Sequence, residues 1–119
     1  MSYISGFVLA VPTANKETYR AHAAKAAELF KEYGMVEMVE AWGTDVPDGK
    51  VTDFKRAVQA KDDETVVFSW MVWPDKATAD AGEQKMREDP RMQELGDMPF
   101  DGKRMIYGGF TPVLEVGRP

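Results

Sequence analysis

Residues 64–73, ETVVFSWMVW, constrain the fold more than any other part of this chain. Successive side chains of a strand point to opposite faces, and here both faces are largely apolar. Val66, Phe68, Trp70 and Val72 share one face, and Val67, Met71 and Trp73 share the other. Residues 3–11, YISGFVLAV, repeat this pattern and end at Pro12. Because such strands need cover on both faces, we predict that these two are the central strands of a sheet.

Helical signals separate the predicted strands. Asn15 is a helix-capping residue type before residues 16–33, and Gly34 is placed to end that helix. Asp75 is placed to cap a second helix, which should end near residue 89 because Pro90 disfavours helix in its predecessor. Two further strands are predicted at 35–46 and 104–116. Turns are predicted at 47–49 and 62–63, and a long loop at 90–103. Residues 52–58 form either a helical turn or extended chain.

The resulting order, β-α-β-β-α-β, predicts an α+β, ferredoxin-like fold with an antiparallel sheet, in a single domain spanning 1–119. Two helices can cover only one face of that sheet. We expect a second copy of the chain to cover the other face, which gives a dimeric α/β barrel. The alternative is a monomer whose 90–103 loop folds over the open face, although that loop has few large apolar residues.

Charge and cysteine content limit the classes of binding partner and the kinds of site that the chain can have. The chain has 15 basic and 20 acidic residues, a net charge of −5, and scattered Lys and Arg. This balance disfavours nucleic acid and anionic membrane surfaces as partners. The absence of cysteine excludes disulfides and thiolate sites, and it fits a cytoplasmic location. The N-terminal apolar segment is expected to be a strand, because no basic leader precedes it.

Several segments carry a family resemblance that extends over nearly the whole chain. They are 41–43 (AWG), Asp45 with the 47–49 turn, 52–54 (TDF), 64–70, 89–92 (DPRM) and, above all, 98–105 (MPFDGKRM) followed by 108–110 (GGF). In these motifs the chain resembles the YbaA-like family of unknown function, in the dimeric α/β-barrel superfamily. The resemblance implies a ferredoxin-like fold and a homodimer, and it implies no reaction.

Two aromatic side chains are candidates for binding a ligand. His22 is the only histidine and lies beside the apolar stripe of the first helix, where it is either a base over a pocket or a boundary residue. Trp42, on a predicted edge strand, either lines an apolar pocket or packs in the core. One histidine cannot build a multi-histidine metal site, and the glycine pair at 108–109 lacks the rest of a dinucleotide fingerprint. We therefore expect neither a metal nor a cofactor.

Charged residues form a second candidate group. Asp45 and Asp53 flank the turn at 47–49, and Arg104 opens the last predicted strand. A carboxylate beside an arginine either binds a polar ligand, with Arg56 as a further member, or forms an ion pair that holds loops together. The second interpretation is favoured for this group.

Two functions remain open. In the first, the protein binds a small organic molecule in a pocket between sheet and helices, lined by at least two of Trp42, His22, Asp45 and Arg104. In the second, it is a structural or interaction module without catalysis, in which Asp53, Arg91 and Arg104 cap backbone groups or contact another chain. No nucleophile, base and orienting group can be assembled from the sequence, so whether the protein is an enzyme stays open.

Overall fold

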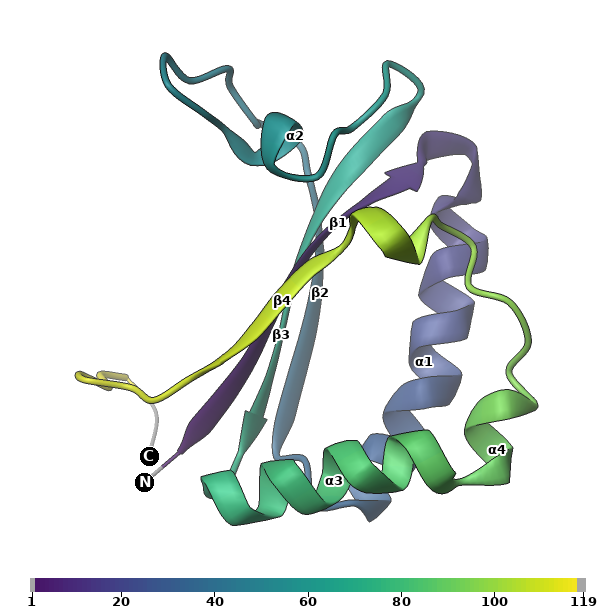
Figure 1. Cartoon of the computed structure of the whole chain (residues 1–119), viewed down its shortest axis with the longest axis vertical. Coiled ribbons are helices and arrows are strands. Elements are labelled where there is room, and N and C mark those ends of the chain that lie inside the picture. The colour runs from purple at the N-terminus through teal and green to yellow at the C-terminus, as the bar shows by residue number, and fades with distance from the viewer. Residues whose placement is uncertain (1, 118–119) are drawn as a thin grey trace.

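The computed structural model describes residues 2–117, and its centre is a four-stranded antiparallel sheet with the long helices on one face (Figure 1). The strands are β1 (Tyr3–Pro12), β2 (Glu37–Trp42), β3 (Glu64–Trp73) and β4 (Ile106–Phe110), in the spatial order β2-β3-β1-β4. The two strands with apolar faces, β1 and β3, are central and pair along their full lengths. The predicted α+β, ferredoxin-like fold is confirmed.

The helices begin and end where local signals place them. They are α1 (Lys16–Glu32), α2 (Phe54–Ala57), α3 (Lys76–Glu88) and α4 (Pro90–Gln93), with short 3-10 turns at Thr13–Asn15 and Gly102–Arg104. The Asp75 carboxylate accepts the backbone N–H of Thr78 at 2.7 Å and so caps α3. Gly34 follows α1 with φ 109°, a left-handed conformation that glycine adopts without strain. Asn15 precedes α1, but its side chain donates to the Pro99 carbonyl instead of capping the helix.

The main core lies between the sheet and the helices α1 and α3. Its centre is Trp73, which is fully buried and donates its indole N–H to Ser5 Oγ at 3.1 Å. Gly82 of α3 lies against the same indole, so close that a Cβ there would be 2.6 Å from the ring. The missing side chain therefore lets α3 approach the sheet.

Residues 90–103 do not form the structureless loop that we predicted. Pro90 starts the short helix α4, whose first turn is capped by Asp89, and residues 102–104 form a 3-10 turn. Met92, Leu95 and Phe100 pack against the core on the helix-covered face. The alternative monomer, with this segment over the open face of the sheet, is therefore wrong.

Both edge strands are shorter than predicted. Strand β2 covers Glu37–Trp42 rather than 35–46, and β4 covers Ile106–Phe110 rather than 104–116. Strand β4 pairs only with residues Ile4 to Val8 of β1, so Pro112 lies beyond the last pair. Alternation in the sequence marks extended chain, but the length of a strand depends on its pairing partner.

The second face of the sheet is only partly covered. The segment that contains α2 lies on this side, opposite α1 (Figure 1). Its residues Val58 and Ala60 pack against Ala10 and Val66 at one end of the sheet. The remaining surface, which we call the open face, is largely apolar, with Glu37 at its β2 edge. Its exposed large side chains include Phe68 (47%), Ile106 (45%) and Phe110 (58%).

Candidate functional site

A pocket of about 440 Å³ lies between α1 and the edge strand β2. We call it the α1–β2 pocket. Ala23 and Ala27 form its helix wall, and Met38 and Trp42 form its strand wall. The pocket stays open because these two residues are alanines, whereas larger side chains at the same positions would reach the sheet. Its size falls within the range of about 300–1,000 Å³ that is typical of ligand pockets.

Three polar side chains meet inside this apolar surrounding, and we call them the Glu40 cluster. The Tyr19 hydroxyl donates to Glu40 Oε1 at 2.5 Å, and the Ser69 hydroxyl donates to Glu40 Oε2 at 2.9 Å. Tyr19 and Ser69 are buried, and Glu40 is half-buried and lines the pocket. The cluster thus joins α1, β2 and β3 beneath the pocket.

Burial changes the acidity of the Glu40 cluster. Desolvation raises the pKa of the Glu40 carboxyl, although the hydrogen bonds from Tyr19 and Ser69 act in the opposite direction. The pKa of the Tyr19 hydroxyl is also raised, first by burial and then by the nearby Glu40 charge. A carboxyl with raised proton affinity in a pocket is suited to hydrogen bonding or proton transfer with a ligand.

Charged side chains of both signs lie at the outer edge of the pocket. The Lys16 ammonium lies 5.5 Å from the centre of the Trp42 ring. Arg20 also lines the pocket, and its guanidinium pairs with Glu17 at 3.0 Å. Glu17 and Glu37 line the pocket as well, so the site combines apolar walls, an inner carboxyl and a rim of mixed charge.

Of the four residues expected to line one pocket, the structure brings only Trp42 to the α1–β2 pocket. His22 is on α1 but is not among the lining residues, and within residues 2–117 its buried Nε2 atom has no hydrogen-bond partner. Asp45 lines a separate polar hollow, together with residues such as Lys61 and Glu64. Among residues 2–117, the α1–β2 pocket therefore does not combine two of these four residues.

Asp53 holds the loop before α2. Its carboxylate accepts the backbone N–H of Arg56 at 2.7 Å, the backbone N–H of Gly49 at 3.1 Å and the Arg56 guanidinium at 3.0 Å. The backbone N–H of Arg56, with these other donors, lowers the pKa of Asp53 to about 2. Asp53 thus caps α2 and holds the preceding loop through the backbone of Gly49.

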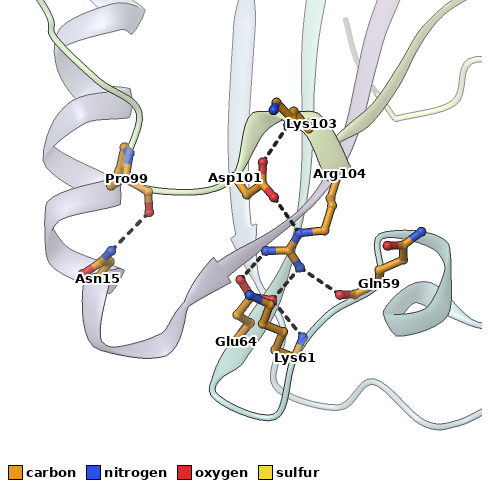
Figure 2. A network of polar contacts seen from close by, with 8 residues as sticks. All are labelled: Asn15, Gln59, Lys61, Glu64, Pro99, Asp101, Lys103 and Arg104. Carbon is orange, nitrogen blue, oxygen red and sulfur yellow. Dashed lines mark hydrogen bonds and ion pairs between the residues drawn. The ribbon is translucent and has the colours of Figure 1, made fainter.

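Arg104 is the centre of the network drawn in Figure 2. Its guanidinium bonds Glu64 at 2.7 Å, Asp101 at 3.0 Å and the Gln59 carbonyl at 2.8 Å. The Arg104 and Glu64 side chains are 15% and 5% exposed. The Arg104 hydrogen bond is the main reason that the pKa of Glu64 is lowered to about 2. This group fits the interpretation that we favoured from the sequence, an ion pair that holds loops together.

Sequence reasoning missed the Glu40 cluster. A glutamate such as Glu40 is ordinary on an exposed edge strand, and Tyr19 falls on the apolar stripe of α1, so neither residue by itself indicates a site. Alternation along β2 contains a usable signal, because Glu40 shares its face with Met38 and Trp42. An ionisable residue on an apolar face is a candidate for function.

No helix between residues 2 and 117 is long and apolar enough to cross a lipid bilayer. In the same part of the chain, no group of three acidic or histidine side chains is arranged to hold a metal ion.

Two solved structures share the fold at low sequence identity. The first is SnoaB, a cofactor-independent oxygenase from Streptomyces nogalater, at a TM-score of 0.58, 16% identity and 98% coverage of both chains. The second is a dimeric ferredoxin-like protein from an uncultured marine organism, at a TM-score of 0.55 and 12% identity, covering 97% of this chain and 98% of the other. These similarities support the α+β, ferredoxin-like fold.

Proteins of similar sequence show to which family this chain belongs. The chain is 60% identical over 116 residues to the uncharacterized protein YbaA of Escherichia coli, covering 97% of this chain and 99% of that protein. The YbaA protein of Shigella flexneri matches to the same extent. Residues 2–102 match the family described as protein of unknown function (DUF1428). The chain therefore belongs to the DUF1428 family, together with the YbaA proteins.

Proposed function

We propose that this protein is a homodimer whose subunits each bind a small organic molecule in the α1–β2 pocket. The Glu40 cluster carries the proposal. A protein core usually keeps carboxylates out, yet here a half-buried carboxyl and a buried tyrosine hydroxyl meet beside a pocket of about 440 Å³ with apolar walls. An apolar cavity with a few convergent polar groups is the usual form of a small-molecule site.

The fold is compatible with this function. SnoaB, which shares the fold, is an oxygenase that needs no cofactor. The architecture can therefore serve a protein that acts on small molecules. At 16% identity the similarity extends to the fold, so the ligand must be inferred from this chain's own residues.

The homodimer is supported by the open face. Phe68, Ile106 and Phe110 expose large apolar side chains on a surface that the protein's own helices leave uncovered. A second copy, related by two-fold symmetry, would bury the same surface on both subunits. The description of a protein of the same fold as dimeric is consistent with this arrangement.

A thermal-shift screen with a metabolite library tests ligand binding. A ligand that binds only the folded protein raises its Tm. The Ala27→Phe variant places a ring in the pocket, whereas Ala21→Phe makes the same change at an exposed position of α1 outside the pocket. We expect compounds that raise the Tm of the wild type and of Ala21→Phe but not of Ala27→Phe.

Two results would contradict binding in this pocket. The first is a set of active compounds that stabilise Ala27→Phe as much as the wild type. The second is a library in which no compound separates Ala21→Phe from Ala27→Phe. Circular dichroism of both variants establishes beforehand that each is folded.

A further inference from the structure

The hydrogen bonds that Glu40 already makes define what a ligand must offer it. The Tyr19 and Ser69 hydroxyls both donate, one to each carboxylate oxygen. An ionised carboxylate accepts about four hydrogen bonds and donates none. The positions left on Glu40 therefore accept hydrogen bonds, and the ligand atom that meets them must be a donor.

Charge restricts the kind of donor. Glu40 itself repels an anionic group, because the burial that raises its proton affinity also weakens screening by water. The apolar walls oppose a cation, because an ammonium would lose its hydration among them, and the Lys16 ammonium over the Trp42 ring at the edge of the pocket adds repulsion. A neutral hydroxyl is disfavoured by neither of these effects.

The walls define the rest of the molecule. Ala23, Ala27 and Met38 offer no hydrogen-bonding side-chain group of ordinary strength, and Trp42 offers a flat apolar surface. The part of the ligand that lies against them is therefore apolar.

We propose that the α1–β2 pocket takes a neutral apolar alcohol or phenol whose hydroxyl donates a hydrogen bond to Glu40. This inference rests on the proposed function, since it names the ligand class of the same pocket. Tyr19 and Ser69 are positioning residues, because they hold the carboxylate without occupying all of its acceptor positions.

Equilibrium dialysis with a matched pair of probes tests the inference. The probes are 2-naphthol and 2-methoxynaphthalene, which share a ring system and differ in that only the first can donate a hydrogen bond. We expect the wild type to bind 2-naphthol about tenfold more tightly, as one hydrogen bond to a charged group allows. The cation 2-naphthylmethylamine should bind more weakly than 2-naphthol.

Variants assign the preference to Glu40. Glu40→Gln should reduce the difference between the two probes to less than about threefold, because one acceptor oxygen becomes an amide nitrogen that only donates, and the remaining amide oxygen is uncharged and accepts more weakly. Glu83→Gln is the matched control: this glutamate is exposed on α3 and does not line the pocket, so the same change there should leave the preference intact. Tyr19→Phe keeps the carboxylate and removes one of its donors, and it should retain the preference even if Glu40→Gln does not fold.

The outcomes separate this inference from the proposed function. Equal binding of 2-naphthol and its methyl ether, both blocked by Ala27→Phe, would overturn the hydroxyl inference and leave ligand binding in the pocket supported. Tighter binding of the amine, or loss of the preference in Tyr19→Phe, would also overturn it. Naphthol binding that Ala27→Phe does not affect would contradict both proposals.

Discussion

Glu40 brings an ionisable group into a largely apolar setting, and this has a consequence for stability. Desolvation raises the pKa of its carboxyl above the ordinary value of 4.5, so the folded protein holds this proton more tightly than the unfolded chain. At a pH where Glu40 ionises, the charge lowers the free energy of unfolding relative to the protonated form. Functional sites often carry such local penalties.

Comparison of the wild type with Glu40→Gln across pH tests this account. As the pH rises above 4.5, the folded state keeps the proton that the unfolded chain loses, so the contribution of Glu40 to the free energy of unfolding falls. We expect the stability of the wild type relative to Glu40→Gln to decline over this range. Urea unfolding at several pH values measures the difference, and a difference that rises with pH would contradict the raised pKa.

The other charged residues of interest have the opposite character. Asp53 and Glu64 are held as carboxylates by donors, which lowers the pKa of each to about 2. Each ionised carboxylate therefore adds to the free energy of unfolding at pH values above its ordinary pKa, which is near 4. This stabilisation is lost as the pH falls towards 2. Sequence reasoning could name Asp53 and Arg104 as charged partners, but only the fold shows that their partners are loop groups rather than a ligand.

At the scale of elements, most local signals predicted the structure correctly, and the predictions that failed depend on a distant partner. The Asn15 cap is one of the failures, because its side chain donates to the Pro99 carbonyl instead. The Pro12 stop, the Gly34 end and the Asp75 cap are decided by neighbouring residues, and each was read correctly. The ends of β2 and β4 depend on the neighbouring strand, so the sequence overestimated both. The path of residues 90–103 depends on their contacts with the core, which no local pattern contains.

The Asp75 cap gives a prediction at this scale. Asp75→Ala leaves the first-turn N–H groups of α3 without their side-chain acceptor and should lower the free energy of unfolding by about 1 kcal/mol. Asp75→Asn is the control, because asparagine caps nearly as well as aspartate. Equal losses in the two variants, measured by chemical denaturation, would show that the cap is not the cause.

At the scale of the whole molecule, the two faces of the sheet have different roles. One face packs on α1 and α3 and leaves the α1–β2 pocket at the β2 edge. The other face is covered only where the α2 segment reaches it. The apolar alternation of β1 and β3 predicted this two-faced sheet. The pocket could not be predicted in the same way, because it arises from the distance between α1 and β2 and from the small alanines between them.

Sedimentation equilibrium at micromolar concentration tests most directly whether the open face joins two copies of the chain. We expect a mass of twice 13.3 kDa for the wild type. Phe68→Glu, which places a charge on the open face, should shift the mass towards a single chain, whereas Ala21→Glu, at an exposed position of α1 on the opposite side of the sheet, should not. A stable monomeric wild type with Phe68 in water would contradict the account.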